Sequence, residues 1–281
     1  MNVLIKRSIT GLVFALIMIL GLSWNMWSAL FLLGIILTGS AIEWNQNFSG
    51  KNPIQAFLNS IYGVMVLICL GALSFFTFFR SFLDSWILNA ILISCLSFSI
   101  SAGLILKNSK RHNPPVFNIY TCFLYVCLPV LTIGLFYIHD FGITKSWVLF
   151  VVVVNWANDT FAYLTGKYLG KNKLAYNISP GKTIEGAVGG ILMAIISGIL
   201  INENLIRLTP QLNMPQVCLL CLTITLFGIL GDLFESYLKR RAGIKDSGSI
   251  LPGHGGFLDR FDSFFFSVPA GIFVLWIIFN S

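Results

Sequence analysis

Long apolar runs separated by short polar segments occupy most of this 281-residue chain. A helix needs about 20 mostly apolar residues to cross a bilayer. By that measure the sequence predicts about nine membrane-spanning helices, at residues 8–22, 25–42, 56–79, 84–106, 116–138, 146–165, 184–202, 214–234 and 257–279. The first two are short and predict a tight helical hairpin around Gly21–Ser23. The alternation typical of transmembrane barrels is not seen, so the predicted fold class is all-α, a polytopic membrane helix bundle.

The composition supports a membrane protein and excludes other classes. Only 10% of the residues are charged and 56% are apolar, whereas an average soluble domain carries roughly 25% charged residues. So few charges cannot cover the surface of a soluble protein of this size, and disordered, collagen-like and disulfide-framework chains fit no better.

The distribution of basic residues predicts the orientation in the membrane. All but three of the 18 Lys and Arg residues fall on the side of the predicted bundle that holds the N-terminus, and the exceptions are Arg80, Lys145 and Arg207. Loops rich in Lys and Arg stay in the cytoplasm, so we expect a cytoplasmic N-terminus and an external C-terminus. The net charge of +7 then reflects orientation and attraction to anionic lipid headgroups, and we expect no nucleic-acid partner.

The predicted spans form two regions, or one integrated domain. Residues 1–145 hold about five spans, and residues 146–281 hold about four spans with two polar cytoplasmic loops, at 166–183 and 235–256. These are the longest polar segments on the cytoplasmic side, so we expect the functional site there.

Acidic residues gather near the end of the chain. Five of the 11 acids fall between positions 232 and 262. One helix face is predicted to carry Asp232, Glu235, Ser236, Lys239 and Arg240, and Asp259, Asp262 and Ser263 repeat the spacing at the start of the last span. Ionisable groups at membrane depth are functional by default. Carboxylates beside Lys and Arg are typical of a site in which Mg²⁺ and cations hold phosphates, although a solvated face of mutual salt bridges is the simpler alternative.

A second polar cluster follows the sixth predicted span. Asn155, Asn158 and Asp159 share a helix face, and the next loop brings Lys167, Lys171, Lys173 and Lys182. Gly181-Lys182-Thr183 imitates the end of a P-loop, but Tyr176 replaces the first glycine and no strand is predicted before it. Lys182 and Thr183 at a helix start are still expected to contact phosphate. Gly186 and Gly190 predict close helix packing.

These residues resemble the signature of phosphatidate cytidylyltransferases, also called CDP-diacylglycerol synthases. The resemblance rests on Ser236-Tyr237-Leu238-Lys239-Arg240, Lys245-Asp246, Pro252, His254-Gly255-Gly256 and Asp259-Arg260-Phe261-Asp262. The segment 159–186 is also similar, with Phe161 as a departure where the family usually has a small residue. Strong resemblance covers about 150–281, and the first half is similar mainly in hydropathy.

The resemblance implies a reaction in which CTP and phosphatidate give CDP-diacylglycerol and pyrophosphate, a committed step of phospholipid biosynthesis. It implies dependence on Mg²⁺, with a second cation left open, a site facing the cytoplasm of a bacterial inner membrane, contact with membrane lipids, and often a homodimer. The ionised lipid phosphate would attack the α-phosphate of CTP directly, so that no general base is needed.

The residues and the resemblance together predict roles for individual side chains. By matching positions, Asp232 and Asp259 are the principal metal ligands, assisted by Asp262 and Asp246. The groups expected to hold phosphates during catalysis are Lys239, Arg240, Lys245 and Arg260. The residues expected to bind or orient substrate are Asp159, Lys171, Lys182, Ser236, His254, Gly255 and Gly256.

Two other functions would also place charges inside a helical bundle. A transporter of an anionic solute predicts an inverted repeat with interrupted helices in both halves, and Pro269 has no counterpart in the first half. An alcohol phosphatidyltransferase acting on CDP-lipids predicts two late acids four residues apart, whereas Asp259 and Asp262 are three apart. A non-catalytic membrane scaffold is the simplest alternative.

Overall fold

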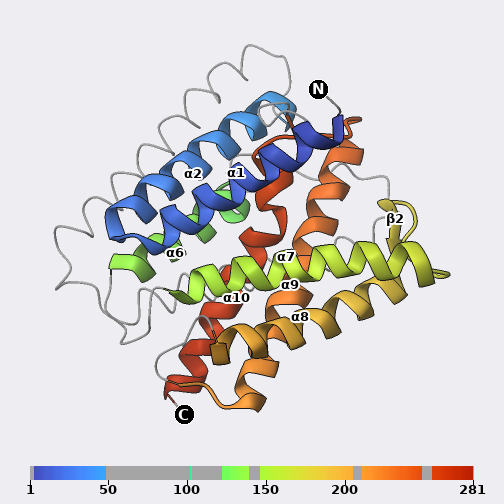
Figure 1. Ribbon diagram of the computed structural model, residues 1–281. Helices are drawn as coiled ribbons and strands as arrows, with labels where there is room; N and C mark the ends of the chain where they lie inside the picture. The colour runs from blue at the N-terminus through green and yellow to red at the C-terminus, as the bar shows by residue number, and fades with distance from the viewer. Residues whose placement is uncertain are drawn as a thin grey trace.

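The computed structural model describes residues 3–48, 102, 122–138, 146–204, 211–248 and 255–280. The predicted spans 56–79 and 84–106, the first part of span 116–138, and His254 lie outside these ranges, apart from the single helical position Ala102. The helices are α1 (Val3–Ser23), α2 (Met26–Phe48), the π-helix η2 (Phe123–Cys127), α6 (Leu128–Ile138), α7 (Ser146–Leu169), α8 (Ile184–Asn204), α9 (Met214–Arg241) and α10 (Leu258–Asn280). They form a helical bundle (Figure 1).

Most of the predicted spans that fall in the described ranges are present as helices. Five of them are long and apolar enough to cross a membrane: Met26–Phe48, Trp147–Leu169, Ile184–Glu203, Met214–Arg241 and Leu258–Phe279. Two shorter apolar helices cover Ile9–Ser23 and Phe123–Gly134. A polytopic helical membrane protein is therefore consistent with the structure.

One part of the sequence prediction is wrong. The segment 166–183, expected as a loop, continues α7 to Leu169 and then forms an antiparallel pair of strands, β1 (Lys173–Ala175) and β2 (Ser179–Thr183). A strand thus precedes Tyr176 after all, and Gly181-Lys182-Thr183 lies within β2 rather than in a phosphate-binding loop. The hairpin is held by local backbone pairing and by Ile184 N donating to Asn172 O at 2.9 Å. The 235–256 segment also begins as helix, because α9 extends to Arg241, in line with the helix face expected there.

The predicted α1–α2 hairpin is confirmed and has a defined turn. Asn25 caps α2, since its Oδ1 accepts from Ser28 N at 2.8 Å while Ser28 Oγ accepts from Asn25 N at 3.1 Å. The same hydroxyl donates to Gly21 O at 3.0 Å, which ties the end of α1 to the start of α2. Reciprocal capping of this kind satisfies amides that would otherwise lack partners at a helix start.

The contact between α7 and α8 depends on small residues. A Cβ at Gly190 would lie 2.8 Å from Asn158 O and 2.8 Å from the Ala162 Cβ, so a larger side chain would force the helices apart. Gly186 meets the Gly166 Cα in the same way, which confirms the predicted close packing. The opposite face of α8 exposes a stripe of large apolar side chains at four-residue spacing, as expected of a surface that meets lipid: Ile184, Val188, Leu192, Ile196 and Leu200.

A buried aromatic cluster joins the helices beneath the polar residues. The Tyr125 ring of η2 lies 5.4 Å from Phe234 of α9, and 5.3 and 5.6 Å from Phe265 and Phe266 of α10. The Trp44 ring of α2 lies 5.9 Å from Tyr125 in a tilted arrangement. The edge-on contacts fix α9 and α10 against each other close to the acids that both helices carry.

The helix ends that carry the predicted site gather at one end of the bundle. In Figure 1 the start of α1, the ends of α2 and α9, the start of α10 and the β-hairpin lie toward the upper right. The turn between α1 and α2, the start of α9 and the C-terminus lie toward the lower left. The distribution of Lys and Arg assigns the first group of helix ends, together with the β-hairpin, to the side of the membrane that holds the N-terminus.

We predict that Gly190→Leu lowers the thermal unfolding midpoint of the detergent-solubilised protein, because the new side chain must displace the α7 backbone. Overpacking of this kind costs about 1–3 kcal/mol or more. The control is Val188→Leu, which enlarges a side chain on the exposed face of the same helix and should leave the midpoint unchanged. Equal midpoints for both variants would contradict the close packing of α7 and α8.

Candidate active site

Four aspartates from three helices meet at one cavity of about 470 Å³. Asp159 comes from α7, Asp232 from α9, and Asp259 and Asp262 from α10, and Lys182 of β2 lines the same cavity. The helix faces expected from the spacing of these residues therefore do converge. The β-hairpin adds polar lining from Ser179, Gly181 and Thr183.

Asp232 is held by one hydroxyl and one cation. Ser236, one turn later on α9, donates its Oγ to Asp232 Oδ1 at 3.3 Å, and Asp232 Oδ2 forms an ion pair with Lys182 Nζ. The two charged side chains are 27% and 28% exposed. A pair this open to solvent contributes little to stability, so its partners can be exchanged for a ligand at small cost.

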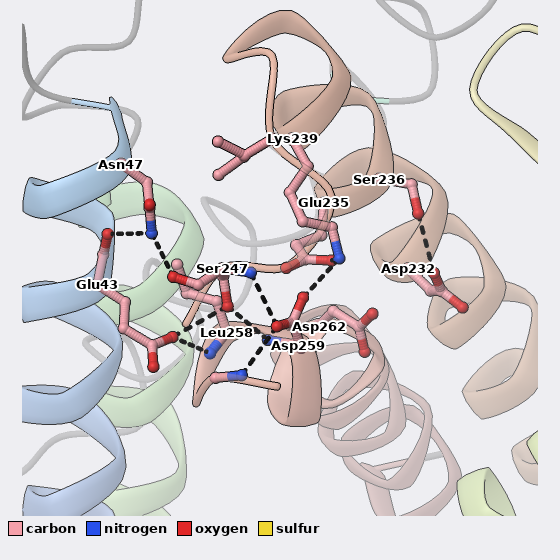
Figure 2. Close-up of polar contacts among 12 residues, drawn as sticks. Glu43, Asn47, Asp232, Glu235, Ser236, Lys239, Ser247, Leu258, Asp259 and Asp262 are labelled. Atoms are coloured by element: carbon pink, nitrogen blue, oxygen red, sulfur yellow. Dashed lines mark hydrogen bonds and ion pairs between the residues drawn. The ribbon is translucent and has the colours of Figure 1, made fainter. Parts of the chain in front are cut away.

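Asp259 is surrounded more completely, as Figure 2 shows. Its Oδ1 accepts from Lys239 Nζ at 2.6 Å, and its Oδ2 accepts from the backbone amides of Ser247 at 2.9 Å and Gly256 at 2.8 Å. Lys239 also pairs with Glu235 Oε2 at 2.5 Å. Two acids thus share one lysine in a largely buried network.

The three side chains of that network are shielded from solvent. Lys239 is 12% exposed, while the side chains of Glu235 and Asp259 are 1% and 9% exposed. A low-dielectric site raises the cost of an unpartnered charge, so the two acids and the lysine depend on one another.

Asp262 belongs to two cavities. Its Oδ1 accepts from Ser263 N at 2.6 Å, and it lines both the large cavity and a second one of about 280 Å³. The second cavity lies among α1, α7 and α10, and its walls include Phe14, Trp156 and Arg260. Asp159, Asp259 and Asp262 line both cavities, so these aspartates lie between a chamber that also holds Lys182 and one that also holds Phe14, Trp156 and Arg260.

The remaining predicted site residues fall into three groups. Ser236 and Arg240 bind groups around the cavity and do not line it. Ser236 donates to Asp232, and Arg240 Nε donates to Ile178 O, directly before β2, at 3.4 Å. Lys171, Lys245 and Asp246 are exposed and line neither cavity. Gly255 has a positive φ of 81°, and the Gly256 amide binds Asp259. The amide that sequence analysis assigned to substrate therefore supports an aspartate here.

Two residues to which the sequence analysis gave no role are important to this geometry. Glu185 at the start of α8 accepts from the backbone amides of Lys171, at 3.0 Å, and Asn172, at 3.1 Å, and so holds the hairpin that presents Lys182. Glu43 of α2 accepts from the amides of Phe257 and Leu258 at the start of α10. An acid directly after the predicted span 25–42 was the signal that could have identified Glu43.

The donor set fits an ion of the Mg²⁺ type. In proteins Mg²⁺ is bound through one or two carboxylates plus substrate phosphates and water. Four aspartates bring carboxylates to the large cavity: Asp159, Asp232, Asp259 and Asp262. Within the ranges that the structure describes, no three His, Cys, Asp or Glu side chains are grouped so as to hold a metal by themselves. The site therefore suits an ion that takes part of its coordination from a phosphate ligand.

Proteins named phosphatidate cytidylyltransferase are similar to this chain. The chain is similar to the phosphatidate cytidylyltransferase of Bacillus subtilis, with 48% identity over 140 residues, which is 49% of each protein. It is 46% identical over 141 residues to the protein of the same name from Staphylococcus epidermidis, covering 49% of this chain and 52% of that protein. For Staphylococcus aureus the identity is 48% over 123 residues, 44% of this chain and 46% of the other.

The match thus spans about half the length of these curated relatives. A family model reaches further, because the model described as the cytidylyltransferase family matches residues 5–278. That match includes the helices that carry Asp159, Asp232, Asp259 and Asp262, together with α1 and α2. The chain belongs to the cytidylyltransferase family.

Proposed function

We propose that this protein transfers the cytidylyl group of CTP to phosphatidate, forming CDP-diacylglycerol and pyrophosphate. The observation that carries the proposal is the convergence of four aspartates and Lys182 on one cavity in a chain of the cytidylyltransferase family. Carboxylates and ammonium groups on the same wall suit a triphosphate that brings its own divalent cation. The relatives named phosphatidate cytidylyltransferase support the lipid as the second substrate.

The two cavities suggest how the substrates are separated. The triphosphate would enter the larger cavity, where Lys182 and the hairpin meet Asp232. The lipid phosphate would enter the smaller cavity beside Arg260, with its acyl chains near Phe14 and Trp156. The shared carboxylates then lie where the two phosphates have to meet.

The reaction requires no protein nucleophile. An oxygen of the ionised lipid phosphate forms a bond to the α-phosphorus of CTP, and the bond from that phosphorus to the bridging oxygen breaks as pyrophosphate leaves. Catalysis would come from in-line positioning and charge neutralisation. Asp232, Asp259 and Asp262 would hold Mg²⁺, which neutralises phosphate charge when bound. Lys182 and Arg260, which line the two cavities, would hold the phosphate oxygens that the ion leaves uncovered, and Lys239 would keep Asp259 in place.

We further propose that the N-terminus faces the cytoplasm, as the distribution of Lys and Arg indicates. The site-bearing helix ends in Figure 1 then open to the compartment that supplies CTP. The lipid would stay in the inner leaflet and reach its cavity from the side, between α1, α7 and α10.

We predict that the purified protein converts labelled CTP and phosphatidate to CDP-diacylglycerol and pyrophosphate in the presence of Mg²⁺, and that a chelator stops product formation. The assay separates the lipid product from free nucleotide, with ATP, GTP and UTP as controls for base selection. Undiminished turnover in excess chelator would contradict the metal assignment. Flux of an anionic solute into liposomes without any CDP-lipid would favour the transporter instead.

We predict that Asp259→Asn lowers turnover more than about 100-fold, because it removes a charge that positions Lys239 and belongs to the proposed metal set. The amount of protein inserted in the membrane should stay normal. The matched control is Glu203→Gln, which removes an exposed acid near the C-terminal end of α8, away from the cavity, and should keep wild-type turnover. Wild-type turnover in purified Asp259→Asn would exclude a catalytic role for this carboxylate.

The assignment of one cavity to each substrate predicts a separation of KM values. Lys182→Met should raise the KM for CTP about tenfold or more, and Arg260→Met should do the same for phosphatidate, because each loses a charge-assisted hydrogen bond. Arg241→Met removes a cation that lies over the Tyr237 ring and lines neither cavity, so it should change neither KM. A rise in the same KM for both Lys182→Met and Arg260→Met would refute the two-chamber arrangement.

A further inference from the structure

A buried acid from the first part of the chain reaches the turn that carries Asp259. Glu43 lies near the end of α2 and is 1% exposed. In Figure 2 it stands on one side of the start of α10, while Asp232 stands on the other. Glu43 lines neither of the two substrate cavities. Glu43 therefore does not contact a substrate in either cavity, and its role must come from the residues that it binds.

Glu43 binds the start of α10 through its carboxylate. Oε1 accepts from Phe257 N at 2.8 Å and Oε2 accepts from Leu258 N at 3.0 Å. The first amides of a helix have no partner within the helix, and the helix dipole favours a negative charge at that end. Glu43 thus serves α10 as a cap supplied by another helix.

The same carboxylate also binds the segment after α9. Oε2 accepts from Ser247 Oγ at 3.0 Å, and Asn47, one turn later on α2, donates to Ser247 O. Among the residues that the structure describes, the Glu43 carboxylate binds one hydroxyl and two backbone amides, and no ion pair to it is found. A buried carboxylate held by neutral donors is expensive to desolvate, which argues that its position is needed.

Two glycines make room for this carboxylate. A Cβ at Gly256 would overlap both Glu43 oxygens, and a Cβ at Gly248 would lie 2.9 Å from the Glu43 Cδ. Gly256 belongs to the glycine-rich segment that sequence analysis assigned to substrate contact. The structure gives this glycine a different requirement, namely the close approach of Glu43.

Ser247 and Gly256 connect Glu43 to Asp259. Ser247 N and Gly256 N both donate to Asp259 Oδ2, at 2.9 and 2.8 Å, and Asp259 N donates to Ser247 Oγ at 3.3 Å. Each amide that orients Asp259 therefore lies in a segment that Glu43 also contacts. With Oδ2 fixed in this way, Oδ1 is left to face Lys239 at 2.6 Å.

We propose that Glu43 is a positioning residue for Asp259, which it orients through Ser247 and the 256–258 turn without touching substrate. The proposal rests on the function proposed above, and it makes α2, far from the C-terminal signature in sequence, part of the same site. Outer partners of this kind typically change activity about 10- to 100-fold when they are removed.

The test combines steady-state kinetics with amide exchange on the purified full-length protein. Glu43→Gln keeps the size of the side chain but replaces one acceptor oxygen with a donor. We expect kcat to fall about 10- to 100-fold, with the KM values for CTP and phosphatidate within about twofold of wild type, because no substrate contact is lost. Amide exchange at Phe257 and Leu258 should speed up, while exchange in α8 stays the same. Glu203→Gln should change none of these values.

Ser247→Ala supplies a second, smaller substitution that cuts the connection but leaves the two amide hydrogen bonds of Glu43. It should lower kcat at unchanged KM, and adding Glu43→Gln should lower kcat no further than the worse single variant, because both act on one path. Glu203→Gln should instead combine independently with Ser247→Ala. Normal kcat in Ser247→Ala, or full multiplication of the Ser247→Ala and Glu43→Gln effects, would overturn the proposed path.

The wild-type protein in the same assay separates this proposal from the proposed function. If wild type forms no CDP-diacylglycerol, the proposed function fails, and amide exchange alone decides the positioning of the turn. Unchanged exchange at Phe257 and Leu258 in Glu43→Gln would then overturn the positioning role. If wild type is active and Glu43→Gln is equally active, only the positioning role fails.

Discussion

The shared ion pair of Lys239 with Glu235 and Asp259 is the interaction on which the polar end of this bundle depends. It joins α9 to α10 in a largely buried place, so each acid can be kept there only with a partner. The backbone amides of Ser247 and Gly256 complete the coordination of Asp259. Removal of any one of these groups leaves the others buried with fewer partners, and the network therefore acts as a unit.

The packing beneath this network determines where its charges point. The Tyr125 ring contacts α9 and α10 together, and the close approach of α7 to α8 brings Asp159 beside the hairpin that carries Lys182. The outer face of α8 is apolar and suited to lipid. A packed apolar bundle thus supports, at one end, a chamber whose walls carry four aspartates and Lys182.

Sequence analysis predicted the convergence of the aspartates because helical spacing determines which residues share a face. Asp232 and Ser236, four residues apart, do bond to each other, and Asp259 does meet Lys239. The β-hairpin at 173–183 escaped prediction because its strands are short and polar, and Pro180 and Gly181 within β2 conceal any alternation. Contacts between segments more than 200 residues apart, such as Glu43 with Ser247 and Leu258, carry no local signal at all. An acid directly after a predicted span marks Glu43 as important, but only the fold shows its partners.

The central claim is that the chamber among α7, α9, α10 and the hairpin receives the triphosphate of CTP. An experimental structure of the protein with CTP, a divalent cation and a non-reactive phosphatidate analogue tests it most directly. The account predicts a triphosphate between Lys182 and Asp232, with its α-phosphorus near Asp262 and the lipid phosphate arriving from the side of Arg260. A triphosphate bound away from these aspartates, with the chamber left to solvent or lipid, would contradict it.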